Sequence, residues 1–198
     1  MTTLMKPLIV REELLRRKVR IFTVEEFSRI FQIPSYSTKY FLEEQTDQGL
    51  LVRLKKGLYA LKTDYPSEEE IANALYKPSY ISFEYALAYY SILPEMPYKV
   101  TCATTKPTRI FTVGDIDFAY YTIKNEAYTG YSLVKTESKT FLIADREKAL
   151  VDYLYFENLG KRGHNERLVI KDIDKAKLIR YAEIYGRASL MDLVKRYL

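Results

Sequence analysis

The pattern of apolar and polar positions predicts three helices in the first fifty residues: 10–18, 24–31 and 37–48. In the first helix, Leu14 and Leu15 are expected to face inward. The second begins with Thr23 and Glu26, which are spaced as in a capping box. Gly49 follows the third helix, where a left-handed residue commonly ends a helix.

Two short strands follow, residues 51–55 and 58–61, joined by a turn that contains Lys56 and Gly57. Three helices followed by a basic hairpin are the elements of a winged helix-turn-helix, in their usual order. In such domains the third helix enters the major groove of DNA and the hairpin lies along the backbone. The sequence therefore predicts a winged helix-turn-helix DNA-binding domain over residues 1–63.

The third predicted helix has one side suited to a core and one suited to contacts. The residues expected to face inward are Thr38, Phe41, Leu42 and Gln45. The candidate DNA-binding residues come from the helix start, its other side and the hairpin: Ser35, Tyr36, Ser37, Lys39, Tyr40, Arg53, Lys55 and Lys56. The lysines suit phosphates or a guanine edge, and the serines begin a helix whose amides suit phosphate. Two alternatives stay open, a winged helix that contacts only proteins and a core position for Tyr40.

After a linker at residues 63–67, the pattern changes to a mixture of helices and strands. Helices are expected from residue 68 to before Pro78 and over 83–90, 146–156, 174–185 and 189–197. Strands are expected over 99–104, 109–113, 118–123 and 140–144, where β-branched and aromatic residues dominate. The fold class is therefore predicted as α+β, with a mixed α+β domain over residues 64–198.

Composition and charge narrow the function classes. The single cysteine, Cys102, excludes a disulfide framework, and the single histidine, His164, leaves little material for a metal site, so no cofactor is expected. Of the net charge of +5, residues 1–65 contribute 12 basic minus 8 acidic residues, or +4. This localised excess of basic residues favours nucleic acid over a membrane as the partner. The alternative is an ordinary solvated surface that carries the same net charge. With no signal pattern and no long apolar run, a cytoplasmic protein is expected.

An ordered set of short segments resembles a known family. The segments are 56–59, 71–75, 77–82, 84–87, 100–101, 104–106, 109–111, 143–144 and 147–152. Together they resemble the AbiEi antitoxins of abortive-infection toxin–antitoxin systems, over residues 22–156. The first ten residues and those after 158 show no such likeness.

The resemblance implies a phage-defence antitoxin that represses its own operon by binding double-stranded operator DNA, and a homodimer on DNA is compatible with it. It also implies a second domain that counteracts a nucleotidyltransferase-type toxin, which need not be bound directly. No enzymatic activity is implied. Carried over by position, the antitoxin surface comprises Ser82, Glu84, Thr101, Thr104, Lys106, Arg109, Glu147, Lys148 and Asp152.

Plainer interpretations of these residues remain open. Ser82 is placed to cap a helix, and Lys106 and Arg109 flank a turn that solvent would surround. Lys148 and Asp152 are four apart on a predicted helix, so a surface ion pair explains them.

Two other functions compete with the antitoxin. One is a simple winged-helix regulator whose second domain senses a ligand or dimerises. The other is a magnesium-dependent nuclease that uses Asp117, Glu137 and Lys139, because carboxylates hold Mg²⁺ and a lysine can approach the attacked phosphate.

Overall fold

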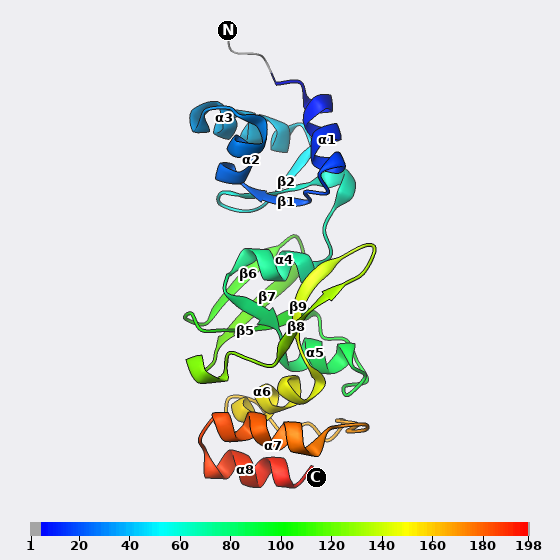
Figure 1. Ribbon diagram of the computed structural model, residues 1–198, viewed down its shortest axis with the longest axis vertical. Coiled ribbons are helices and arrows are strands. Elements are labelled where there is room, and N and C mark those ends of the chain that lie inside the picture. The colour runs from blue at the N-terminus through cyan, green and yellow to red at the C-terminus, as the bar shows by residue number, and fades with distance from the viewer. Residues whose placement is uncertain (1–4, 198) are drawn as a thin grey trace. The chain divides into compact units, whose positions relative to one another are not determined.

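The computed structural model describes residues 5–197 (Figure 1). The chain forms two compact units, the first ending at Leu75 and the second beginning at Tyr76. Both contain helices and strands, so the α+β fold class is confirmed.

The first unit combines helices with a small antiparallel sheet. Its elements are α1 (Pro7–Arg16), β1 (Ile21–Thr23), α2 (Val24–Phe31), α3 (Ser35–Asp47), β2 (Leu51–Lys55), β3 (Leu58–Leu61), η1 (Lys62–Asp64) and α4 (Glu68–Leu75). The strands lie in the order β1-β3-β2, and β2 and β3 form the predicted hairpin. Strand β1 was not predicted because three residues are too few to show an alternating pattern.

The helix boundaries follow from local chemistry. The predicted capping box at α2 is present: the Glu26 amide donates to Thr23 Oγ1 over 3.2 Å, and the Thr23 amide donates to Glu26 Oε2 over 2.7 Å. Helix α1 begins three residues earlier than predicted because Pro7 suits a first helical position. The prediction that Leu15 faces inward is wrong: Leu14 is fully buried, whereas Leu15 is 37% exposed.

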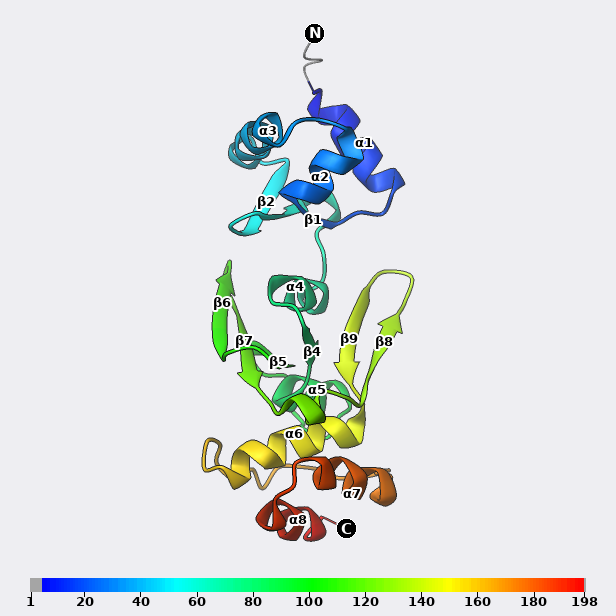
Figure 2. The same cartoon turned by 60° about the vertical axis from the view of Figure 1, so that its left-hand side comes forward.

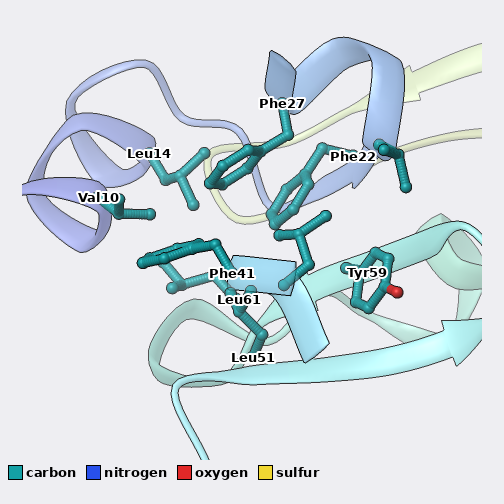
Figure 3. Packing of buried hydrophobic residues seen from close by; sticks show 10 residues of the cluster. Val10, Leu14, Phe22, Phe27, Phe41, Leu51, Tyr59 and Leu61 are labelled. Atoms are coloured by element: carbon teal, nitrogen blue, oxygen red, sulfur yellow. The ribbon is translucent and has the colours of Figure 1, made fainter. Parts of the chain in front are cut away.

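Aromatic side chains dominate the core of the first unit (Figure 3). Phe27 of α2 lies at its centre, with its ring centroid 5.3 Å from that of Phe22 and 5.8 Å from that of Phe41. Because Phe41 belongs to α3, this packing holds the inner side of α3 against α2 and the sheet.

Helix α4 belongs to the first unit, so the boundary lies after Leu75 rather than after residue 63, as the linker suggested. Arg20 explains part of this attachment, since its guanidinium contacts Asp64 over 3.0 Å and Glu70 of α4 over 3.3 Å. The ammonium of Lys55 on β2 also donates to the Leu75 carbonyl. The predicted linker is therefore part of the first unit.

The second unit is built on a six-stranded mixed sheet. Its strands are β4 (Ser79–Ile81), β5 (Lys99–Thr104), β6 (Arg109–Val113), β7 (Ile116–Thr122), β8 (Tyr131–Lys135) and β9 (Thr140–Ala144). They lie in the order β6-β7-β5-β4-β9-β8, with β5–β7 and β4–β9 parallel and the other pairs antiparallel. Strands β4 and β8 were not predicted.

The helical elements of the second unit are α5 (Phe83–Tyr89), η2 (Asn125–Ala127), α6 (Arg146–Asn158), α7 (Lys175–Ile184) and α8 (Ala188–Lys195). Helices α6, α7 and α8 pack together on one side of the sheet (Figure 2). Because α6 contacts α5 as well as α7 and α8, every residue from 147 to 156 is buried. A helix enclosed on all sides leaves no surface for its polar residues, and this determines the environment of several predicted site residues.

Candidate functional site

The outer side of α3 carries an exposed group of aromatic and basic side chains. Tyr36 and Tyr40 are 85% and 68% exposed, and Lys39 is exposed between them. The predicted inner side is confirmed, since Thr38, Phe41, Leu42 and Gln45 are all buried. Tyr40 is therefore not a core residue. The spacing of residues 36, 39 and 40 places these three side chains on one stripe of the helix.

The start of α3 lies beside the same stripe. Ser35 is the first residue of the helix and is exposed, and Ser37 is half-buried. The first amides of a helix have no acceptors within it, and the helix dipole favours a negative charge there. This end of α3 thus suits a phosphate group.

The hairpin supplies basic side chains, but its two adjacent lysines differ. Arg53 and Lys56 are exposed, and Lys56 precedes the turn at Gly57, whose φ of +77° suits glycine. Lys55 is half-buried, with its ammonium on the Leu75 carbonyl. The hairpin therefore presents Arg53 and Lys56 outward, and Lys55 has a partner within the first unit.

The predicted antitoxin surface is largely interior. Six of its nine members are buried: Ser82, Thr101, Thr104, Glu147, Lys148 and Asp152. The prediction that these residues form a surface is wrong, because it assigned outward positions to the enclosed helix α6 and to the central strands of the sheet.

Asp152 lies at the centre of a buried cluster of polar side chains, together with Tyr80, Ser82, Lys148 and Tyr185. Its Oδ2 accepts hydrogen bonds from the hydroxyls of Tyr80 over 3.0 Å and Ser82 over 2.7 Å. Its Oδ1 accepts from the Tyr185 hydroxyl over 2.5 Å and from the ammonium of Lys148. The Lys148 ammonium also lies 3.2 Å from the Tyr185 hydroxyl. We call these five residues the Asp152 cluster.

The Asp152 cluster connects three parts of the second unit. Tyr80 and Ser82 belong to β4 and the residue after it, Lys148 and Asp152 to α6, and Tyr185 follows α7. Lys148 and Asp152 do form the predicted ion pair, but they are 1% and 0% exposed, so the surface interpretation is wrong. With every donor directed at the carboxylate and no exposed member, the cluster is suited to fixing these elements relative to one another.

The pKa values of the two tyrosines reflect the buried position of the Asp152 cluster. Burial raises the pKa of Tyr80 and Tyr185 well above that of a free tyrosine, and the nearby Asp152 charge raises both further. Both hydroxyls therefore remain protonated and donate to Asp152 over the physiological pH range.

The remaining polar members from the sheet also make internal bonds. Ser82 precedes α5, but its hydroxyl donates to Asp152 instead of capping the helix. The cap comes from β5, where Thr101 Oγ1 accepts from the Tyr85 amide over 3.1 Å. Thr104 Oγ1 donates to the Pro78 carbonyl over 2.7 Å. These three hydroxyls thus support the fold around β4.

Two more predicted residues, Glu84 and Glu147, pair with cations of later segments. Glu84 forms an ion pair with Arg162, whose guanidinium lies 4.5 Å from the Phe83 ring centroid. Glu147 contacts Lys177 of α7 over 3.4 Å. Both acids therefore hold residues after 158 against the rest of the unit.

Lys106 and Arg109 are the exposed members of the predicted set. Each lies over an aromatic ring: Lys106 Nζ is 5.4 Å from the Tyr76 centroid, and the Arg109 guanidinium carbon is 5.5 Å from that of Phe111. Together, Lys106 and Arg109 form an exposed basic surface at the β5–β6 connection and the start of β6.

The nuclease residues are not brought together. Asp117 is on β7, whereas Glu137 and Lys139 lie in the β8–β9 turn. Strands β5 and β4 separate β7 from β9, and three strand spacings amount to about 14 Å. The nuclease alternative is therefore not supported by this geometry.

Residues 5–197 show neither a group of metal ligands nor a membrane-spanning helix. Among these residues, no three or more histidine, cysteine, aspartate or glutamate side chains are grouped as metal ligands would be. In the same range, none of the helices is long and apolar enough to span a bilayer. Cys102 is buried, and burial raises its pKa, whereas His164 is exposed and lies 3.0 Å from Glu157.

Sequence reasoning missed Tyr80, Tyr185 and Arg162. The i,i+4 spacing of Lys148 and Asp152 was visible, but it does not distinguish a surface pair from a buried one. Tyr185 lies outside the segments that resemble a family, and the sequence around it does not indicate that it contacts α6.

Replacing Asp152 with alanine should destabilise the second unit. The change leaves the Lys148 ammonium buried without its counter-charge, a loss that typically costs about 3–5 kcal/mol. The measurement is urea unfolding followed by circular dichroism. As a control, Lys106→Ala at an exposed position should cost no more than about 0.5 kcal/mol. Equal effects of the two substitutions would show that the Asp152 cluster does not hold the unit together.

The Asp152 cluster should also make stability fall at alkaline pH. Since the folded pKa values of Tyr80 and Tyr185 are raised, their contribution to stability is present below pH ~10, the pKa of an unfolded tyrosine, and declines above it. Tyr80→Phe or Tyr185→Phe should reduce that decline by up to about 1.4 kcal/mol per pH unit. Unfolding free energies measured across this range check it, with Tyr98→Phe at an exposed hydroxyl as control. An unchanged slope in both cluster variants would contradict the assignment.

Comparison with known proteins finds a similarity within the first unit. Residues 12–62 match a family described as "Transcriptional regulator, AbiEi antitoxin". No curated protein matches the chain. The matched residues include α2, α3 and the β2–β3 hairpin, whereas the segments of likeness after residue 62 lie outside the match. Over its winged helix, the chain is thus similar to the AbiEi antitoxin transcriptional regulators, and the resemblance seen in its sequence is confirmed there.

Proposed function

We propose that the chain is the antitoxin of an abortive-infection toxin–antitoxin system that represses its own operon. In this proposal, α3 and the β2–β3 hairpin bind operator DNA, and the second unit counteracts a toxin of nucleotidyltransferase type. The observation that carries the DNA-binding part is the exposed stripe of Tyr36, Lys39 and Tyr40 on the matched winged helix.

The exposed side chains of α3 suit the two kinds of contact that DNA offers. Lys39 can bind a phosphate or the acceptors of a guanine, and the tyrosine hydroxyls can donate to phosphates. Glu43, exposed one turn beyond Lys39, can accept from the amino group of a cytosine. Large aromatic side chains that extend into solvent from a helix gain contact area when a partner covers them.

The hairpin adds contacts that do not depend on DNA sequence. Arg53 and Lys56 are exposed cations, and each phosphate that they neutralise releases counterions. With its ammonium on the Leu75 carbonyl, Lys55 contributes less to such binding than Lys56.

For the second unit, the proposal rests on the resemblance of its segments to the antitoxin family. Lys106 and Arg109 are its exposed candidates, and the buried residues of the same segments support the fold that presents them. The toxin need not be bound directly for the second unit to counteract it.

Removing Lys39 or Lys56 should weaken binding to the DNA upstream of the gene. Each alanine variant should lower the slope of log K against log salt concentration by about 0.9, because one phosphate contact is lost. Fluorescence anisotropy at several salt concentrations measures this slope. Lys135→Ala, at an exposed position on β8 in the second unit, is the matched control. If Lys39→Ala and Lys56→Ala behave like this control, α3 and the hairpin are not the DNA-binding surface.

Growth rescue tests the antitoxin part independently of DNA binding. A nucleotidyltransferase-type toxin encoded beside the gene is expressed together with the full chain from an unrelated promoter. The wild type and the Lys39→Ala/Lys56→Ala variant should both restore growth, whereas Lys106→Ala/Arg109→Ala should restore it less. If the stably expressed wild type fails to rescue, the antitoxin proposal falls and a simple winged-helix regulator becomes the preferred function.

A further inference from the structure

Helix α1 exposes apolar side chains on the side opposite its core contacts. Val10 and Leu14 anchor it, with 1% and 0% exposure, whereas Leu8 is 60%, Ile9 57% and Leu15 37% exposed. Three large aliphatic residues on one short helix form an apolar surface that a partner can cover.

The exposed stripe of α1 is complementary to itself when a second copy runs antiparallel. Leu8, Arg11, Glu12 and Leu15 follow one another at intervals of three, one and three residues, and all are exposed. About a two-fold axis between residues 11 and 12, Leu8 of one copy meets Leu15 of the other. In the same register Arg11 meets Glu12, and each of these contacts occurs twice.

The two central charges are available for such a contact. Glu13 is already bound by Arg16 over 2.7 Å and by Arg17 over 2.5 Å, and these hydrogen bonds lower its pKa to about 2. Within the described residues, the side chains of Arg11 and Glu12 form no ion pair. The unused pair therefore lies at the middle of the apolar stripe, where a symmetric partner would supply both opposite charges.

A groove borders the stripe and offers room for an aliphatic side chain of the partner. It measures about 440 Å³ and lies between α1 and the end of α2. Its lining is mixed: three residues are apolar, and the others are charged or polar, namely Ile9, Ile30 and Phe31 against Glu12, Glu13, Arg16 and Gln32.

We propose that α1 is a homodimer interface, in which two copies of the chain pack their α1 helices antiparallel about a two-fold axis. Leu8 contacts Leu15 of the second copy, and Arg11 pairs with Glu12 of the second copy. The partner is a second copy, because an antiparallel copy of the same stripe places leucine against leucine and arginine against glutamate.

The geometry of the first unit is compatible with DNA binding by such a dimer. Helices α1 and α3 are separate elements of the first unit (Figures 1 and 2), and all the side chains proposed for pairing belong to α1. A helix of ten residues is about 15 Å long, and one such pair buries less than a standard interface of about 1,600 Å². We therefore expect a weak association, which requires a high protein concentration to be observed.

The test reverses the charges of Arg11 and Glu12, which lie next to the two-fold axis. Dimerisation of the full chain is measured by sedimentation velocity at ~100 μM without DNA. Arg11→Glu alone places two carboxylates opposite each other at both central contacts, and Glu12→Arg alone places two guanidinium groups there. Each single variant should therefore dimerise at least tenfold more weakly than the wild type. An equimolar mixture of the two should associate as heterodimers, because both contacts are then attractive, and the double variant should recover the homodimer.

Lys135→Glu makes the same kind of charge reversal as Arg11→Glu at an exposed site on β8 and should leave the dimer unchanged. Circular dichroism verifies that every variant is folded. A monomeric wild type, single variants that dimerise like the wild type, or a mixture no more associated than its components would overturn the proposal. The measurement contains no DNA and no toxin, so its failure would leave the proposed function untouched.

Discussion

A buried carboxylate must be surrounded by donors, and Asp152 imposes this constraint on the second unit. Its charge has no access to water, so hydroxyls and one ammonium replace the lost hydration. These donors come from the region of β4, from α6 itself and from the residue after α7, and the carboxylate is satisfied only when all of them are in place. One side chain thereby connects the sheet to the helices.

The two units use polar residues in opposite ways. In the first, aromatic packing around Phe27 holds α3, and the polar and aromatic residues on its outer side are left in solvent. In the second, most of the polar residues that resemble family segments lie inside and hold the structure together. The segments that resemble a family thus leave polar side chains exposed in the first unit and enclose most of them in the second.

Local signals made the winged helix predictable. The capping box at Thr23, the turn at Gly57 and the apolar stripe of α3 each act within a few residues, and the structure has the elements that they indicate. The short strands β1 and β4 were missed because their pairing depends on distant partners, whereas β8 was missed although its partner β9 follows it directly.

The burial of Lys148 and Asp152 was unpredictable for a related reason. Their spacing on α6 is the same for a surface pair and an interior one. Besides α5, the helices that enclose α6 are α7 and α8, which follow in a part of the chain without recognisable motifs. Whether a charged residue is buried depends on which distant elements pack over it. The sequence immediately around the residue does not specify those elements.

The bond from Lys55 to the Leu75 carbonyl affects how the DNA-binding part can be isolated for study. Cutting the chain at the apparent linker, after residue 63, would remove that carbonyl together with Asp64 and Glu70, the acidic partners of Arg20. Two cations next to the hairpin would lose acceptors, and the fragment would gain positive charge that the intact protein neutralises. DNA affinity measured on such a fragment would then report partly on the cut, so a fragment that ends after Leu75 is the appropriate choice.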